Sequence, residues 1–326
     1  MKAEKRIQHR WSSSIKPSHM EHSPIYLTYE DRWINSGAIY LRAEQIIPKL
    51  ACSRPVYSRP ISALSNTTNS IIIIIKPKLV LVNSLFNRTI KKLQRGNNKI
   101  ILDVVDNIDS IEPIDNNPIV RRIKQHQSHS IVKNIDSAIF CSEKARQRFQ
   151  HIFKRPQECV TLYHHWDERL RLAPPAQQDK IRIGYFGIDW KAYSYGHIPG
   201  IDFFSLTKPS DLPSIEFSKY NVHYIIKPDT FRCRYEPLTK IATAAAVGAV
   251  VISTKEQSEE LLGPDYPYYS DEITIPDILK VIDKVHNTFR KEEWKQAMSI
   301  MTSVKYNTSL DTIAARYSKY LARIER

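Results

Sequence analysis

From Pro24 onward, short runs rich in apolar and β-branched residues alternate with longer stretches of helical pattern. Such alternation is typical of a parallel sheet covered by helices. In the first half of the chain, strands are expected at residues 25–28, 56–59, 71–75, 100–105, 137–141 and 160–163. Helices are expected between them, at residues 38–50, 78–94, 118–134 and 142–153. The pattern therefore predicts an α/β domain over residues 24–166.

Local signals mark the ends of several of these helices. Either Asn35 or Ser36 can cap the helix at 38–50, and Ser142 can cap the helix at 142–153, because such side chains accept hydrogen bonds from N–H groups of the first turn. Gly96 is expected to supply the left-handed residue after the helix at 78–94.

A second α/β unit follows a connector. Residues 167–180 contain Pro174, Pro175 and two glutamines, which is the composition of a linker. Beyond them, strands are expected at 181–186, 222–226 and 249–252, and helices at 238–247, 277–287 and 308–324. We expect a second domain over residues 181–305 and a C-terminal helix within residues 306–326 that can cross back to the first domain.

Composition excludes two common nucleotide-binding classes. The 326 residues include only 8 glycines, and neither G-x-G-x-x-G nor G-x-x-x-x-G-K-[ST] occurs. Dinucleotide dehydrogenases and P-loop NTPases need such glycines to bring backbone N–H groups to phosphates. The four cysteines are far apart and form no C-x-x-C pair. This spacing argues against a zinc module or a disulfide framework and favours a reducing compartment.

The positive charge is concentrated in the first half of the chain. The net charge is +14; residues 1–163 carry 26 basic against 13 acidic residues, whereas residues 164–326 carry 22 against 21. Such a field favours an anionic partner, either nucleic acid, an anionic membrane surface or a phosphate-bearing substrate, with a merely solvated basic surface as the alternative. Residues 1–23 are basic and have no apolar signal-peptide core, so we expect a flexible tail or a weak contact with anionic lipid.

The segment at residues 232–252 carries the strongest chemical signal. Arg232, Arg234 and Lys240 lie just before and at the start of a helix built from small residues. A helix N-terminus already favours anions, so three added cations predict a diphosphate site. The alternative is a tightly packed helix with surface cations.

The same segment resembles the donor-site helix of GT-B glycosyltransferases, in particular the retaining enzymes of glycosyltransferase family 4. The run K-I-x-T-A-x-A-x-G-A-V-V-I at residues 240–252 is similar to the family's helix, glycine and short apolar strand. Three other segments follow the family's order, at residues 134–149, 160–170 and 181–187. The resemblance implies two Rossmann-like α/β domains facing across a cleft, with a nucleotide-sugar bound by the second.

The family's Glu-x7-Glu pair is not retained. Its two positions fall on Tyr235 and Thr243, with Glu236 one place off, and a threonine hydroxyl can still hydrogen-bond a ribose. No metal-binding D-x-D is evident, so the resemblance implies a metal-independent transferase without a cofactor. The implied donor-binding residues are Gly187, Arg232, Arg234, Glu236, Thr239, Lys240 and Thr243.

Two places in the first unit are candidates for the acceptor side. Asp106 follows an expected strand and could act as a base toward an acceptor hydroxyl, or it could simply cap the next segment. By the resemblance, the loop around Gly37 approaches the donor phosphates or the acceptor. Gly37, Arg42 and Asn35 are therefore candidates there, with an ordinary helix start as the alternative.

His164 and His165 occupy the place of the family's connector pair. Neighbouring side chains of an extended segment point to opposite sides, so at most one can face a given site. We interpret both first as hinge residues.

Three functions are compatible with these features. The expected one is a cytoplasmic glycosyltransferase, peripheral on the inner face of the membrane, that moves a sugar to a hydroxyl of a glycan or lipid-linked acceptor in surface polysaccharide or glycoconjugate synthesis. A basic nucleic-acid-binding protein is one alternative, disfavoured because the charge is spread over many helices and no binding motif occurs. An inactive GT-B-like partner subunit is the other.

Overall fold

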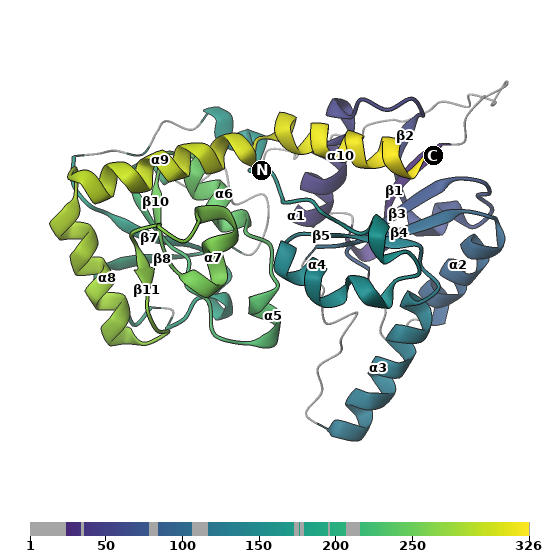
Figure 1. The fold of residues 1–326 in the computed structure, drawn as a ribbon, viewed down its shortest axis with the longest axis horizontal. Helices are drawn as coiled ribbons and strands as arrows, with labels where there is room; N and C mark the ends of the chain where they lie inside the picture. The colour runs from purple at the N-terminus through teal and green to yellow at the C-terminus, as the bar shows by residue number, and fades with distance from the viewer. Residues whose placement is uncertain are drawn as a thin grey trace, which may run out of the picture.

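Two parallel sheets with helices on their faces form two units side by side (Figure 1). The computed structural model describes residues 24–33, 36–77, 84–105, 117–172, 176, 179–194, 196–206 and 216–325. Asn35 and Asp106, both singled out in the sequence, lie outside the described residues.

The first unit contains a six-stranded sheet in the order β2-β1-β3-β4-β5-β6, with every pair parallel. The strands are β1 (Ile25–Tyr29), β2 (Val56–Pro60), β3 (Ile71–Ile75), β4 (Lys99–Val104), β5 (Ser137–Phe140) and β6 (Val160–Thr161). All six were predicted from the sequence. The five isoleucines of β3 are all buried, because a central parallel strand is covered on both faces.

The helices of the first unit are α1 (Gly37–Ile39), α2 (Ser84–Arg95), α3 (Pro118–Val132) and α4 (Glu143–Phe149). After α1 the chain continues as a π-helical segment, Tyr40–Gln45, and a 3-10 turn, Ile47–Lys49. Of the two proposed caps of this helical region, Ser36 accepts a hydrogen bond from the N–H of Ile39 at 3.4 Å. Ser142 caps α4 as predicted, through the N–H of Ala145 at 3.2 Å.

The prediction for Gly96 was wrong in its reason. The left-handed residue after α2 is Asn97, whose φ is 55°. Gly96 is needed instead for close approach, since a Cβ there would lie 2.7 Å from the carbonyl oxygen of Thr67.

The second unit contains a five-stranded parallel sheet in the order β11-β10-β9-β7-β8. Its strands are β7 (Ile183–Gly187), β8 (Ile201–Ser205), β9 (Val222–Tyr224), β10 (Val250–Thr254) and β11 (Tyr269–Ser270). Its helices are α5 (Phe231–Arg234), α6 (Thr239–Ala246), α7 (Lys255–Leu262), α8 (Ile275–Thr288) and α9 (Glu292–Asn307). The sequence pattern missed β8, β11, α5, α7 and α9. Strand β8 is a half-exposed edge, and α9 buries only a narrow stripe, so neither has a strong hydrophobic period.

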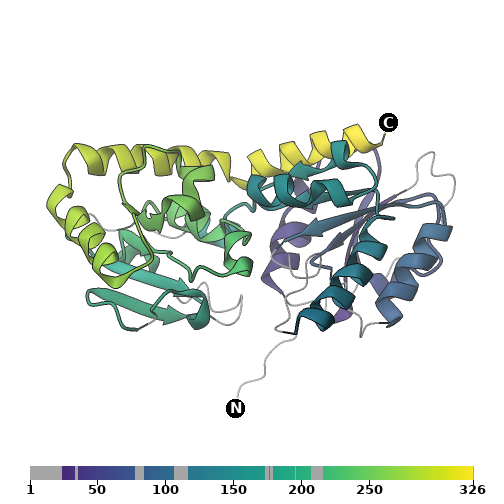
Figure 2. The ribbon, with the colours of Figure 1, turned by 60° about the horizontal axis from the view of Figure 1, so that its bottom comes forward.

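The last helix, α10 (Leu310–Ile324), returns to the first unit and covers one face of its sheet (Figures 1 and 2). Ile313, Tyr317 and Leu321 are fully buried there, in one core with residues of β1, β3 and β4. The C-terminal helix is therefore part of the first domain's core, although it follows the second domain in sequence.

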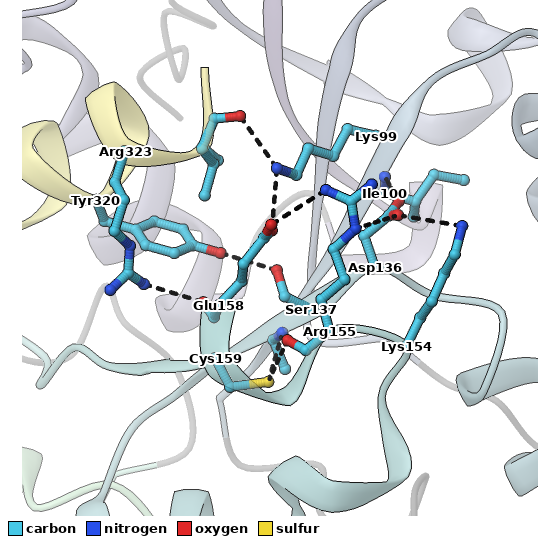
Figure 3. A network of polar contacts seen from close by, with 12 residues as sticks. Lys99, Ile100, Asp136, Ser137, Lys154, Arg155, Glu158, Cys159, Tyr320 and Arg323 are labelled. Carbon is cyan, nitrogen blue, oxygen red and sulfur yellow. Dashed lines mark hydrogen bonds and ion pairs between the residues drawn. The ribbon is translucent and has the colours of Figure 1, made fainter. Parts of the chain in front are cut away.

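Polar contacts fix the far end of α10 (Figure 3). The hydroxyls of Tyr320 and Ser137 lie 3.1 Å apart, and Lys99 donates to the carbonyl of Ile324 at 3.0 Å. Arg323 donates to the carbonyl of Glu158 at 3.1 Å, and the Glu158 carboxylate pairs with Lys99 at 2.9 Å. These contacts hold the helix in one register against β4 and β5.

The chain passes between the two units twice. One crossing is the segment after β6, and the other is the junction of α9 with α10. The backbone N–H of Trp166 donates to the carbonyl of Thr308 at 3.1 Å, and its indole Nε1 donates to the carbonyl of Lys305 at 3.1 Å. The two crossings are thus joined by hydrogen bonds. Among the helices of the described ranges, none combines the length and apolar character that crossing a bilayer requires.

We expect Leu321→Ala to lower the free energy of unfolding by about 2–5 kcal/mol, because it leaves a cavity in the core under α10. The exposed Lys319 on the same helix is the matched control, and Lys319→Ala should change stability by less than about 0.5 kcal/mol. Urea unfolding midpoints measure both. Equal losses in the two variants would contradict the packing of α10 on the first sheet.

Candidate donor-nucleotide site

A small pocket lies at the carboxyl edge of the second sheet. Its volume is about 60 Å³. Its lining comes from the ends of β7, β8 and β9, from the turn before β9 and from α6, and consists of Phe186, Leu206, Phe217, His223, Tyr224, Ile225, Lys240 and Thr243. Parallel α/β sheets bind ligands at this edge, so the pocket has the position of a ligand site. Two residues predicted from the sequence, Lys240 and Thr243, line it.

Lys240 is held close to the end of β7. Its ammonium donates a hydrogen bond to the hydroxyl of Tyr185 at 2.7 Å and lies 4.0 Å from the centre of the same ring. A Cβ on Gly187 would lie 2.8 Å from Lys240 Nζ, so the glycine leaves room for the ammonium. Gly187 and Lys240, both predicted site residues, are therefore in contact.

Glu236, the fourth predicted residue of this group, is buried between two lysines that the sequence did not single out. Its carboxylate oxygens pair with Lys191 Nζ at 2.6 Å and with Lys227 Nζ at 3.4 Å. Lys191 follows β7, and Lys227 follows β9. Because β7 and β9 are neighbours in the sheet, both lysines reach the same carboxylate.

The lysines also act on one another. The pKa of Lys240 lies well below its usual range, first because the ammonium is buried, and next because Lys227 carries the same charge. Glu236 opposes this shift, whereas Lys191 adds to it. Among the described residues, the carboxylate of Glu236 thus lies near the ammonium groups of Lys191, Lys227 and Lys240, and these four groups together carry a positive charge. An anion that entered here would relieve the repulsion and favour the charged form of Lys240.

The other predicted donor-side residues lie on α5 and α6. Arg234 is exposed and forms a two-point ion pair with Asp229, with N–O distances of 2.7 and 2.8 Å. Arg232 belongs to the same short helix, but its side chain is outside the described part of the structure. Thr239 is the first residue of α6, one position before Lys240. The structure thus groups Gly187, Glu236, Lys240 and Thr243, and places Arg234 in a pair of its own.

On the first domain, the predicted residues Gly37 and Arg42 differ in how far they are exposed to solvent. Gly37 starts α1 and is partly exposed. Arg42 is fully buried and so does not have the exposed position expected of a phosphate contact. Its guanidinium donates to the carbonyls of Leu162 and Tyr163 and lies 3.4 Å from the buried carboxylate of Asp103. Burial raises the pKa of Asp103 to about 6, although Arg42 acts in the opposite direction.

The two neighbouring histidines are both buried beside this cluster. His165 Nε2 lies 2.8 Å from Gln45 Oε1, and among the described residues neither ring nitrogen of His164 has a hydrogen-bond partner. Burial and the nearby charge of Arg42 lower the pKa of His165 to about 4 and that of His164 well below its usual range. Both rings are therefore uncharged at neutral pH.

Polar groups join the two domains near α4. The Glu260 carboxylate, from α7, accepts hydrogen bonds from the Tyr163 hydroxyl at 2.7 Å and from the N–H of Lys144 at 3.5 Å. Cys141, just after β5, lies with Sγ 3.6 Å from the carbonyl oxygen of Tyr235. The carboxyl end of β5 therefore faces the second domain.

Comparison with known proteins supports the same architecture. No protein-family model and no curated protein sequence matches the chain. Among solved structures, Anabaena HepE in complex with UDP and glucose has a TM-score of 0.62 at 10% identity, over 92% of this chain and 100% of that one. A UDP-forming trehalose-phosphate synthase from Burkholderia xenovorans has a TM-score of 0.57 at 8% identity, over 93% and 100%.

Two further matches have the same TM-score of 0.57 and 10% identity, and both cover 92% of this chain. One is the lipopolysaccharide outer core galactosyltransferase WaaB, covered over 99% of its length. The other is an α-glucosyltransferase in complex with UDP and a 13-mer DNA, covered over 100%.

The chain therefore has the GT-B glycosyltransferase fold, as the resemblance in its sequence implied. Its two sheets correspond to the two Rossmann-like domains of that fold. The narrower likeness to family 4 stays a prediction.

We expect His223 to make the protein less stable in acid. Burial lowers the pKa of this ring to about 3, so between pH 6.5 and pH 3 the unfolded chain binds a proton that the folded chain does not. Stability is then lost as the pH falls. In His223→Phe, whose ring would lie against Phe186 and Phe217, the Tm should fall less steeply with acid than in the wild type.

The control is Phe217→Leu, which disturbs the same aromatic cluster without removing a titrating group. It should lower the Tm at every pH and keep the wild-type slope. An unchanged slope in His223→Phe would show that His223 is not the group responsible.

Proposed function

We propose that the protein is a glycosyltransferase that uses a nucleotide-sugar donor. The observation that carries the proposal is the group of Lys191, Lys227 and Lys240 around the carboxylate of Glu236, beside the pocket at the carboxyl edge of the second sheet. The presence of UDP in similar folds, such as HepE with UDP and glucose, agrees with it.

The chemistry of sugar transfer needs positive charge at this place. As the bond between the anomeric carbon and the donor phosphate breaks, negative charge develops on the departing diphosphate. Fixed ammonium groups stabilise that charge more in the transition state than in the ground state, which is what accelerates the reaction. In the proposal the lysines supply this charge, and the metal-independent reaction expected from the sequence stays a prediction.

The remaining predicted residues receive roles consistent with their places. Thr243 lines the pocket and would hydrogen-bond the donor ribose with its hydroxyl. Gly187 would let the donor approach the end of β7, and Thr239 would contact the diphosphate from the first turn of α6. Arg232 and Arg234 would add charge from α5.

On the acceptor side, we assign Asp106 as the base and the loop at Gly37 as a contact with acceptor or phosphate. The acceptor would be a glycan or a lipid-linked glycan in surface polysaccharide or glycoconjugate synthesis. The excess charge of the first domain suits an anionic membrane surface, so we propose a cytoplasmic enzyme, peripheral on the inner face of the membrane.

A nucleic-acid-binding protein is the second candidate. The observations in its favour are the net charge of the first half and the similar fold of an α-glucosyltransferase that was solved with DNA. An inactive GT-B-like partner subunit is the third, because the second family glutamate is replaced by Thr243. Stabilisation by nucleotide-sugars and measured transfer separate the three.

We expect Lys240→Ala to weaken donor binding at least tenfold, because it removes a charge-assisted contact with the diphosphate. Thermal shifts with UDP-, GDP-, CMP- and ADP-linked compounds measure this; one nucleotide should stabilise the wild type, and that shift should disappear in the variant. Lys255→Ala, an exposed lysine on α7, is the matched control and should keep the shift. An unchanged affinity in Lys240→Ala would remove the diphosphate assignment.

We expect Asp106→Asn to keep donor binding and to lose transfer by about 10²-fold or more, because an amide cannot accept the acceptor's proton. Asp109→Asn, at the neighbouring carboxylate, is the control. Initial rates with a saturating donor and the thermal shift are measured side by side. Full activity in Asp106→Asn would exclude it as the base.

A further inference from the structure

A cluster of three aromatic rings joins the two domains beside the donor site. Phe149 ends α4 of the first domain, whereas Phe231 and Tyr235 belong to the second domain, at the start of α5 and directly after it. The ring centroid of Phe149 lies 5.2 Å from that of Tyr235 and 6.4 Å from that of Phe231, and the rings meet edge-on. Phe231 and Tyr235 also contact each other, at 5.3 Å. In Figure 1, α4 and α5 accordingly lie next to each other at the border between the domains.

Phe149 is the firmly held member of this cluster. Its side chain is only 3% exposed and belongs to the core of the first domain. Phe231 and Tyr235 are half-buried and pack against that same core, with the edge-to-face geometry that aromatic pairs prefer. A second contact acts at the same place, since Sγ of Cys141, just after β5, lies 3.6 Å from the carbonyl oxygen of Tyr235. The position of Tyr235 is therefore set by the first domain.

Tyr235 is followed directly by the carboxylate of the donor site. Glu236 is 5% exposed and pairs with two lysines of that site. Pro237 comes next; its own φ is fixed, and a residue that precedes proline is restricted to extended backbone conformations. The chain between the ring of Tyr235 and α6, which carries Lys240, thus has little freedom. A shift of the ring would move the Glu236 carboxylate relative to the lysines.

We propose that Phe149 is a positioning residue of the donor site: through the ring of Tyr235 it holds the Glu236 carboxylate between the two lysines with which that carboxylate pairs. The donor site of the second domain is then complete only while the first domain lies against it. A domain arrangement that separates the rings releases Glu236 and changes the charge that a diphosphate meets. This inference rests on the donor assignment proposed above and adds to it a residue of the other domain.

The positioning is measured without a ligand, by amide hydrogen exchange of the full chain. Phe149→Leu keeps an apolar side chain and removes the ring edge, and Tyr235→Ala removes the partner ring. Both should speed exchange across residues 235–243, because Glu236 and the start of α6 lose their fixed place. The conservative Tyr235→Phe, which keeps the ring, should restore the wild-type exchange rate.

Phe153→Leu is the matched control. Phe153 is 4% exposed in the same core of the first domain, and its ring packs edge-on against that of Phe140 at 5.9 Å. Phe153→Leu should lower the Tm as Phe149→Leu does and leave exchange over residues 235–243 unchanged. The control thereby separates a loss of stability from a loss of position.

Donor binding is measured with UDP, GDP, ADP and CMP, of which one should stabilise the wild type. We expect Phe149→Leu and Tyr235→Ala to raise the Kd of that nucleotide about fivefold or more, and Phe153→Leu to keep it. The double variant Phe149→Leu/Tyr235→Ala should bind no more weakly than Tyr235→Ala, because both changes act through the same contact.

The pH dependence of binding is a readout that a merely structural change would not move. The titratable groups that face the Lys240 ammonium are Glu236, Lys227, Lys191, Cys233 and Tyr185. Burial and the two other lysines lower the pKa of Lys240, whereas the Glu236 carboxylate raises it. When Glu236 is displaced, the ammonium loses its proton at lower pH. Donor affinity should therefore fall at a lower pH in Phe149→Leu and Tyr235→Ala than in the wild type, and Phe153→Leu should keep the wild-type profile.

Two results would overturn the positioning role. One is wild-type exchange over residues 235–243 in both Phe149→Leu and Tyr235→Ala. The other is faster exchange in these variants without any change in the Kd of the stabilising nucleotide. If no nucleotide stabilises the wild type, the donor assignment fails, and the exchange experiment by itself decides whether Phe149 holds Glu236 in place.

Discussion

The arrangement of the two domains depends on one buried cation. Arg42 is fully buried, and a charged group in that position is tolerated only when an opposite charge and hydrogen-bond acceptors lie beside it. Its partners are the carboxylate of Asp103, on β4, and the carbonyls of Leu162 and Tyr163, on the segment that leaves β6. The guanidinium therefore fixes the direction in which the chain leaves the first sheet toward the second domain.

The second domain is nearly neutral as a whole and strongly charged at one point. Lys191, Lys227 and Lys240 share one carboxylate, and burial makes their repulsion costly. Several like charges that are held this close together favour the binding of an anion at that place. The function proposed for the domain depends on this local positive charge, which cannot be read from the nearly neutral composition of the domain as a whole.

Much of the fold could be predicted from the sequence, because its signals are local. The five consecutive isoleucines of β3 and the caps Ser36 and Ser142 each act within a few residues. The site could be predicted only in part. Lys191 and Lys227 meet at Glu236 because β7 and β9 are neighbours in the sheet. No short segment of the sequence determines the order of the strands. The burial of Arg42 likewise follows from the distant Asp103. Lys227 comes directly after the strand expected at residues 222–226, and this position is the one signal that could have pointed to it.

The double connection between the domains has a mechanical consequence. The segment that follows β6 and the junction of α9 with α10 are joined by a hydrogen bond from the N–H of Trp166 to the carbonyl of Thr308. Two bodies tied at two neighbouring points cannot slide or separate freely, and their easiest relative motion is a swing about the line through both ties. The return of the C-terminal helix to the first domain thus adds a second connection, and the two connections together define a hinge axis. Any closure of the domains around a substrate is then a rotation about that axis.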